Sequence, residues 1–255
     1  MTSFLPGGGI EVILIIVHGP RLRRWMLLPW SVSGLISVVM PPSASQSDSA
    51  IKARPLAWFA WLVILGALAY FIFKNVPRYF VFTAASCGNY FWAKATWLFP
   101  HVVCGVLAAV LGPLQFLPRM RRDYLPFHRV AGRVYVVAVL IGAIASVGMA
   151  AKVGSDDAAY AFGLIGLALA WVTTTVMAFV AIRRKNLPQH KQWMVRSYVV
   201  TFAFVTFRLV ENMMKAGHIF PDHERGALLA WGCWAIPLLV TEVVLQAGAV
   251  FKTRV

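Results

Sequence analysis

The stretch AGRVYVVAVLIGAIASVGMAA, residues 131–151, decides the fold class of this chain. Arg133 is its only charged residue, and the stretch is about as long as the roughly 20 residues that a helix needs to cross a hydrocarbon core. A backbone inside lipid must satisfy its own hydrogen bonds, so we expect these residues to be helical. The stretch is therefore predicted to be a transmembrane helix.

Five more runs have the same character. They are Pro55–Phe73, His101–Leu117, Tyr160–Ile182, Trp193–Val210 and Gly226–Val250. The composition of the chain agrees, with 60% hydrophobic and 13% charged residues and a mean hydropathy of +0.71. The sequence thus predicts an all-α protein, a polytopic transmembrane helix bundle of about six spans whose main partner is the lipid bilayer.

The charge pattern predicts how the bundle is oriented. The formal net charge is +15, which in a soluble protein would point to nucleic acid. Here the basic residues gather in alternate loops, around 119–133, 183–191 and 252–254, while acidic residues lie in the opposite loops. This is the positive-inside pattern of membrane proteins, so we expect no nucleic acid partner. It predicts cytoplasmic termini and a multi-pass protein of the bacterial inner (cell) membrane.

The chain is expected to have two parts. Residues 1–54 are predicted to be a poorly ordered N-terminal extension, with a flexible linker at Pro41–Ala53, and residues 55–255 to be the six-helix domain. Trp25–Met40 is apolar but short, with arginines before it and small residues after it, as in a signal sequence. The alternative is that translation begins at Met40.

Polar residues from four of the predicted helices share one depth near the cytoplasmic side, and we call this set the inner layer. Its members are Gln115, His128, Arg129, Arg133, His190, Arg196 and Glu242. An ionisable group at such a depth is costly and is usually paired, so Glu242 should pair with Arg133 or Arg196. The pair could pin two helices together, or it could serve as a proton or anion site.

His128 and His190 each precede a helix that enters from the same side. Two neutral imidazoles can ligate one haem iron, so these histidines are candidate axial ligands of a haem b, and the nearby arginines could meet its propionates. The alternative is that each histidine is interfacial and contacts headgroups or backbone.

The opposite side of the membrane carries fewer polar residues. His101 opens the second predicted helix, and Arg208 and Glu211 lie three residues apart near the end of the fifth. Such spacing places Arg208 and Glu211 on one helical face, so we expect them to form an ion pair.

Three motifs between His101 and about Val210 resemble the membrane protein family called domain of unknown function 2306. They are H-x3-G-x6-G-P-x-Q-F from His101, H-R-x2-G-R-x-Y from His128 and H-x2-W-M-x-R-S-Y from His190. The resemblance implies a helical bundle with a family-like core at 101–210, and it implies that the motif residues are the family's fixed polar set. It supplies no activity. The arrangement is also similar in outline to dihaem cytochrome b proteins.

The sequence favours an electron-transfer module linked to a b-type haem or to a quinone, with a redox partner. The first alternative is a small-molecule transporter or binding protein whose site contains Arg133, Arg196, Gln115 and Glu242. The second is a structural accessory subunit of the membrane. No residue pattern points to an enzyme or to particular catalytic residues, and the oligomeric state is left open.

Overall fold

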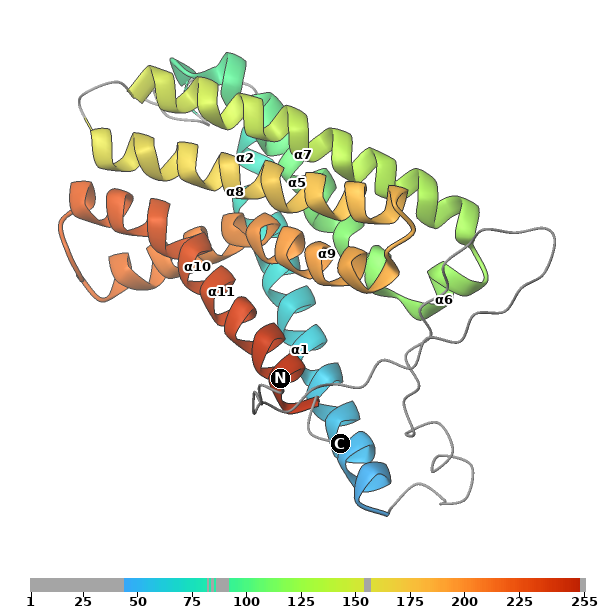
Figure 1. Cartoon of the computed structure of the whole chain (residues 1–255). Coiled ribbons are helices and arrows are strands. Elements are labelled where there is room, and N and C mark those ends of the chain that lie inside the picture. Colours follow the sequence, from blue (N-terminus) through green and yellow to red (C-terminus); the bar gives the residue numbers. More distant parts are fainter. Residues whose placement is uncertain (1–43, 82, 84, 86–91, 154–156, 253–255) are drawn as a thin grey trace, which may run out of the picture. The chain divides into compact units, whose positions relative to one another are not determined.

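The computed structural model describes residues 44–81, 83, 85, 92–153 and 157–252, which form helices joined by short connections (Figure 1). The chain divides into two compact units, Met1–Pro55 and Leu56–Val255. Of the first unit, only the beginning of helix α1 (Ala44–Asn75) is described. Residues 1–43 of the predicted N-terminal extension lie outside the described residues.

Helix α1 begins at Ala44, inside the segment Pro41–Ala53 for which the sequence predicts a flexible linker. Glycine is absent from this segment, and its only prolines precede Ala44. The alanine, glutamine and lysine residues of this segment have high helix propensity, so the segment can extend the helix of the first span.

The six predicted spans are confirmed, since six helical stretches of the described residues are long and apolar enough to cross a membrane. They are Trp58–Asn75, Ala95–Phe116, Leu125–Val153, Ala158–Arg183, Leu187–Ala216 and Glu224–Ala247. Two spans begin well before their apolar runs: the third begins at Leu125 rather than Ala131, and the fifth at Leu187 rather than Trp193. A helix continues past the hydrocarbon boundary wherever its sequence permits, so hydropathy underestimates its length.

Two proline-initiated helices flank the second span. The short helix α2 (Pro77–Phe80) precedes α5 (Ala95–Phe116), and α6 (Pro118–Arg122) follows it. Leu117, between α5 and α6, has extended backbone angles of φ −67° and ψ 122°. A residue before proline is pushed out of the helical region, so Pro118 ends α5 and starts α6.

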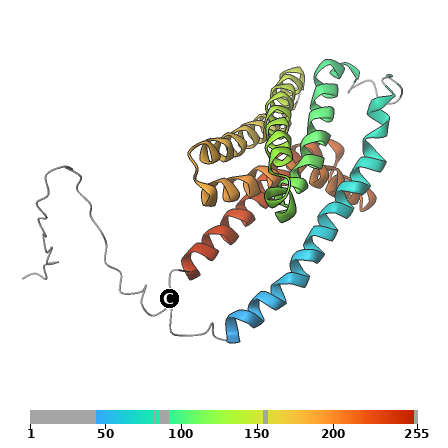
Figure 2. The same cartoon turned by 90° about the vertical axis from the view of Figure 1, so that its right-hand side faces the viewer.

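The next helices form two successive hairpins. Helix α7 (Leu125–Val153) packs against α5 and α8 (Ala158–Arg183), and α8 packs against α9 (Leu187–Thr201). Figure 2 shows α7 beside α5 from a second direction. Capping side chains start two of these helices. Asp157 accepts a hydrogen bond from the Tyr160 amide at 3.0 Å, and Asn186 accepts one from the Gln189 amide at 3.2 Å.

The fifth span is broken at Phe202, where α9 ends and α10 (Ala203–Ala216) begins. Two hydroxyl groups bind carbonyl oxygens beside the break. Thr201 donates to the Ser197 carbonyl at 2.8 Å, and Thr206 donates to the Phe202 carbonyl at 3.3 Å. Threonine hydroxyls that bond back to the helix tend to bend it. The last span belongs to α11 (Asp222–Lys252), which packs against α8, α9 and α10.

The core of the bundle lies between α7, α8 and α9. Trp171 and Tyr135 are its largest fully buried side chains, with Val139 and Val200 beside them. Small residues at helix contacts let backbones approach closely: a Cβ atom on Gly163 of α8 would come within 2.6 Å of the Ala230 Cβ on α11.

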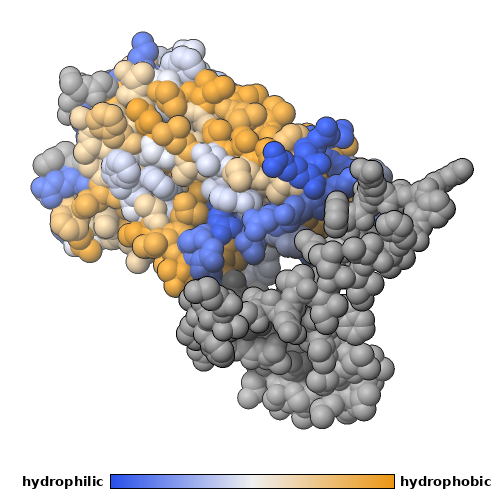
Figure 3. Space-filling model, viewed as in Figure 1, coloured by the Kyte–Doolittle hydropathy of each residue, from blue (hydrophilic) through white to orange (hydrophobic). Residues whose placement is uncertain are grey.

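The outer surface of the bundle suits a bilayer. Hydrophobic residues cover most of the face over α7 and α8, and hydrophilic residues gather toward the end that carries the α8–α9 turn (Figure 3). Large apolar side chains are exposed along the spans, for example Ile144 at 65% and Leu169 at 63%. Lipid tails, rather than water, are the natural neighbours of such side chains.

Candidate functional site

The inner layer contains the ion pair that the sequence predicts for Glu242, and the partner is Arg196. The Arg196 Nε and Nη2 atoms both lie 2.7 Å from the Glu242 Oε2 atom. Gln246 donates to the other carboxylate oxygen at 2.7 Å, and the Arg196 guanidinium lies over the Trp193 ring, 4.7 Å from its centroid. The Arg196 side chain is 8% exposed and that of Glu242 41%, so the pair joins α9 to α11 at the rim of the bundle.

His128 and His190 lie on facing sides of α7 and α9. His128 precedes Tyr135 by seven residues and His190 precedes Ser197 by seven, which is about two helical turns in each case. The Tyr135 hydroxyl and the Ser197 Oγ atom are hydrogen-bonded at 2.8 Å, and the two hairpins make α7 and α9 run in the same direction. Each histidine therefore lies two helical turns before its member of the hydrogen-bonded pair Tyr135–Ser197, on the same side of that pair. His128 is close enough to His190 for the two side chains to interact electrostatically.

The ring nitrogens of these two histidines have different surroundings. The His190 Nδ1 atom lies 2.9 Å from the Ala178 carbonyl oxygen, which can only accept, so this nitrogen carries the proton and donates. The His128 Nδ1 atom is buried and has no hydrogen-bond partner among the described residues. The bond to Ala178 thus fixes the orientation of His190 and leaves its Nε2 atom available to ligate a metal. The Nδ1 atom of His128, by contrast, makes no hydrogen bond to the described residues.

The remaining members of the inner layer are less closely grouped. Gln115 is buried near Gly132, and its Nε2 atom has no partner within the described part of the chain. Arg129 and Arg133 are exposed on the first turns of α7. The pairing of Glu242 leaves Arg133 outside the ion pair, so the structure does not gather Arg133, Arg196, Gln115 and Glu242 around one point.

Hydroxyl groups fill the core between the inner layer and the opposite end of the bundle. The Tyr135 hydroxyl bonds to Ser197 at 2.8 Å and Thr201 at 2.7 Å, Trp171 Nε1 donates to Thr201 at 2.8 Å, and Thr175 bonds to Ser197 at 2.7 Å. The network joins α7, α8 and α9. Its members are 0–1% exposed, so it holds the three helices in register at the centre of the bundle.

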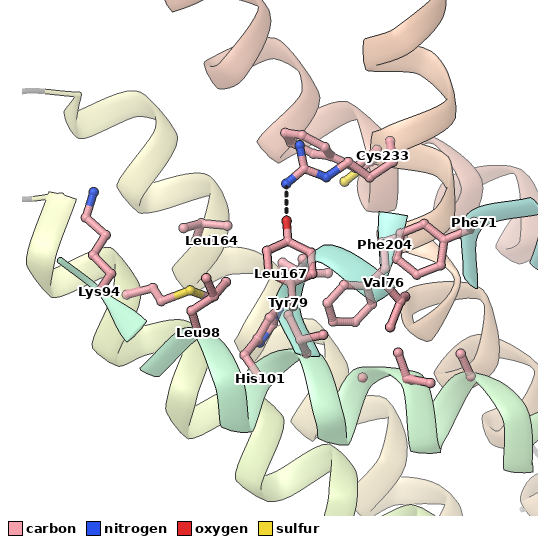
Figure 4. Close-up of a pocket in the computed structure, with 18 of the residues that line it drawn as sticks. Phe71, Val76, Tyr79, Lys94, Leu98, His101, Leu164, Leu167, Phe204 and Cys233 are labelled. Atoms are coloured by element: carbon pink, nitrogen blue, oxygen red, sulfur yellow. Dashed lines mark hydrogen bonds between the residues drawn. The ribbon is translucent and has the colours of Figure 1, made fainter. Parts of the chain in front are cut away.

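A cavity lies at the end of the bundle opposite His128 and His190, and we call it the His101 pocket (Figure 4). It encloses about 130 Å³ and is partly open. Its walls are mostly aliphatic and aromatic, with Leu98, Leu167 and Phe204 among them. The polar and sulfur-bearing side chains of the lining are Tyr79, Lys94, His101, Met149, Tyr160, Arg208 and Cys233.

His101 is held firmly in the pocket wall. Its side chain is 9% exposed, and its Nδ1 atom lies 2.9 Å from the Gly142 carbonyl oxygen of α7. The Phe204 ring lies against the imidazole with centroids 4.7 Å apart, and a Cβ atom on Gly105 would come within 2.8 Å of that ring. The absence of a side chain at Gly105 therefore makes room for Phe204, which in turn supports His101.

The expected ion pair of Arg208 with Glu211 is confirmed and lies beside this pocket. Arg208 Nη1 donates to the Glu211 carboxylate at 2.6 Å, and Nη2 donates to the Tyr79 hydroxyl at 3.3 Å, the bond marked in Figure 4. Lys215 binds the other carboxylate oxygen of Glu211 at 2.8 Å. The carboxylate keeps Arg208 in place while the guanidinium and Tyr79 face the lining.

The sequence does not reveal the pocket itself. Phe204, Tyr79 and Cys233 come from three helices and carry no ligand-type spacing, so nothing local marks them as neighbours. Only His101 and Arg208 stand out in the sequence, because they are ionisable residues within apolar runs. Among the described residues, no three His, Cys, Asp or Glu side chains are grouped to hold a metal ion.

A family model described as Predicted membrane protein (DUF2306) matches residues 98–245. The match includes all of 101–210, over which the sequence shows its resemblance, and it continues into α11. It begins after α1 and α2 and takes in both the inner layer and His101. No curated protein and no solved structure matches the chain.

Proposed function

Since this chain belongs to the DUF2306 family of predicted membrane proteins, as its motifs predict, we propose that it binds a small molecule within the bacterial inner membrane. The proposed ligand is of the quinone class, a flat ring that carries oxygen atoms and an apolar tail. The site is the His101 pocket. The family description names no activity, so the proposal depends on the site alone.

The observation that carries the proposal is the composition of the pocket. Ligand sites are usually concave and mostly apolar, with a few polar groups that fix orientation. The His101 pocket fits this description, because its aliphatic and aromatic walls carry His101 and the Arg208–Tyr79 pair. An enclosed volume of about 130 Å³ suits a single ring, since a dry cavity of similar size can hold benzene. The open side leaves a path for a tail.

The break in the fifth span supports the same proposal. Ala203, Phe204, Phe207 and Arg208 line the pocket, and all four belong to the half-helix that starts at the break. Membrane proteins tolerate interrupted helices where they are buried in protein or line a cavity, and transporters often place ligands at such interruptions. We favour the pocket over the inner layer as a ligand site because the charges of Arg196 and Glu242 already compensate each other, although the buried Nη1 atom of Arg196 has no hydrogen-bond partner among the described residues.

A pair of matched substitutions tests the proposal. Val106 lines the pocket, while Val103 on the same helix is 47% exposed and absent from the lining. Val106→Trp should fill the cavity, and Val103→Trp should leave it open. The probe is a dimethoxy-methyl-benzoquinone with a decyl tail, titrated by calorimetry into the full chain in lipid nanodiscs. We expect saturable binding by the unsubstituted chain and by Val103→Trp, and a loss of at least about tenfold in affinity for Val106→Trp. Equal binding by all three proteins would refute the proposal.

A haem is the second candidate, favoured by one observation. The donor set of His128 and His190 fits a haem iron, because the two imidazoles lie on facing helices and the Ala178 carbonyl fixes the His190 tautomer. His128 and His190 would be the ligands, and Arg129 or Arg133 could meet the propionates. A bound haem would supply one-electron transfer.

The haem proposal has a simple optical test. Full-length protein produced with supplemented haem should show the absorption bands of a low-spin haem, and His128→Ala and His190→Ala should each remove them. His101→Ala should leave the bands intact, because His101 lies at the other end of the bundle. A colourless preparation that folds normally would eliminate this candidate.

A further inference from the structure

We infer that the His101 pocket prefers the reduced, hydroquinone form of its ligand to the oxidised quinone. The inference rests on the proposed function, because it assumes that a quinone-class molecule enters the pocket. It concerns a single atom, the Nε2 of His101, and the kind of hydrogen bond that this atom can make.

The first step is the tautomer of His101. The Gly142 carbonyl oxygen, 2.9 Å from Nδ1, can only accept a hydrogen bond. Nδ1 must therefore carry a proton and donate it to this bond. In a neutral imidazole the other nitrogen, Nε2, then has a lone pair and acts as an acceptor. No hydrogen bond to Nε2 is formed by any of the described residues.

The second step is the charge of the imidazole. The ionised side chains of the described pocket lining are those of Lys94 and Arg208, and both are cations. A third positive charge in a mostly apolar wall would be repelled by them and would lose its water. Glu211 is the acid near Arg208, and it already binds both Arg208 and Lys215. His101 is therefore expected to be neutral, with Nε2 as an acceptor.

The third step is the rigidity of the ring. The Gly142 bond fixes one edge of the imidazole, and Phe204 covers its face at 4.7 Å between centroids. Phe204 is itself packed against Trp171, with ring centroids 5.5 Å apart. A side chain that is 9% exposed and held on two sides cannot easily turn Nε2 toward another partner. The Nε2 acceptor is therefore held in position before any ligand enters the pocket.

The chemistry of the ligand follows from these steps. A hydroquinone has hydroxyl groups that can donate to Nε2, whereas the carbonyl oxygens of a quinone have only lone pairs. A quinone would leave the buried acceptor unpaired and would place two lone pairs against each other, which costs free energy. Tyr79 and Arg208 can serve the second oxygen of either form, because a hydroxyl and a carbonyl both accept hydrogen bonds. The preference for the reduced form thus comes from His101.

The test compares three forms of one probe with the full chain in nanodiscs, under anaerobic conditions. They are the decyl-tailed dimethoxy-methyl-hydroquinone, the corresponding quinone, which has no donor and nearly the same size, and the dimethyl ether of the hydroquinone, which has no donor and is larger by two methyl groups. Calorimetric titration should give a dissociation constant for the hydroquinone about tenfold or more lower than those of the other two. Equal affinities for all three forms would overturn the inference while leaving pocket binding intact.

His101→Asn provides the residue-level test. An asparagine amide can still donate to the Gly142 carbonyl, but it places no atom at Nε2. We expect this variant to fold, to bind the quinone almost normally, and to lose the preference for the hydroquinone. A preference unchanged in this variant would contradict the role of Nε2.

His218→Asn is the matched control. His218 is exposed, lies outside the pocket and has a φ of 52°, which asparagine tolerates. The His218→Asn variant should keep the full preference for the hydroquinone over the quinone. If it lost that preference, His101 could not be the residue that causes it. If no form of the probe binds to any variant, the proposed function fails as well. Equal binding of the three forms is a different outcome. It would contradict the preference for the hydroquinone but not the binding of a quinone-class molecule in the pocket.

Discussion

The ring of Tyr198 on α9 occupies the position that a Cβ atom on Gly112 of α5 would need. The Tyr198 hydroxyl donates to the Ala109 carbonyl at 3.3 Å, and its ring packs against Phe116 with centroids 5.7 Å apart. The tyrosine is thus fixed at both ends while α5 passes directly over it. Gly112 belongs to the first family motif and Tyr198 to the third, so this contact gives both motif positions a structural reason.

We predict that Gly112→Ala destabilises the bundle, because the added methyl group collides with a ring that cannot move away. Overpacking of this kind costs about 1–3 kcal/mol in well-packed cores. Gly66→Ala is the control, since a Cβ atom on Gly66 meets nothing within 4 Å. Thermal unfolding in detergent should show a lower Tm for Gly112→Ala only. Equal midpoints would show that α5 and α9 can separate at little cost.

The Arg196–Glu242 pair should respond to the loss of one partner more than to the loss of both. Glu242→Ala leaves the Arg196 guanidinium, which is 8% exposed, without its carboxylate. We expect a loss of about 1–3 kcal/mol, less than for a fully buried pair because Glu242 is 41% exposed. The double variant Arg196→Met with Glu242→Ala should be milder than either single change. A double-mutant cycle on unfolding free energies measures this, and strict additivity would mean that the pair contributes nothing.

Tyr135→Phe should weaken the core without changing its shape. The substitution removes one hydroxyl and leaves Ser197 and Thr201 each with one fewer partner in a fully buried network. An unsatisfied buried polar group costs about 1–3 kcal/mol. Tyr124→Phe makes the same chemical change at a side chain that is 51% exposed, and its effect should stay within about 0.5 kcal/mol. Indistinguishable unfolding midpoints would mean that the network adapts around the missing hydroxyl.

The predicted orientation can be tested with reporter fusions. Fusions after Arg122 and after Lys185 should report the cytoplasm, because these positions follow clusters of basic residues. Fusions near Asp157 and Asp222 should report the opposite side. Mixed signals within either set would contradict the orientation, although the six spans would remain.

The sequence predicts the spans well because hydropathy depends on local composition. It predicts their ends poorly, as at Leu125 and Leu187, because a helix can continue into the polar region after lipid contact ends. The break at Phe202 was not predicted. It contains no proline or glycine, and it lies where threonine hydroxyls bond back to the helix. Local breakers are therefore an incomplete guide to interruptions in spans.

The candidate sites were predictable to different degrees. The depth of each residue in the membrane, read from its helix, narrows the partner of Glu242 to Arg133 or Arg196. Which of the two forms the pair depends on the face of the helix that each arginine occupies, and the structure shows that it is Arg196. Depth also puts His128 and His190 at the same end of the bundle. The His101 pocket depends on how α1, α2, α5, α7, α8, α10 and α11 come together, and such long-range packing leaves no periodic signal in the sequence.

The sparse contacts of α1 have a consequence for synthesis at the ribosome. Its buried Leu68 packs against Ala109 and Val205, and Trp61 lies 5.8 Å from Phe116 between ring centroids. Translation adds roughly 5–20 residues per second, so α1 leaves the ribosome on the order of ten seconds before Val205 exists. Ala109 and Phe116 of α5 are made within that interval, but until they appear α1 must remain in the bilayer by its own hydrophobicity. The apolar side chains exposed along it, such as Trp58 and Leu62, suit a helix that inserts before the other described spans and gains its contact with Val205 late.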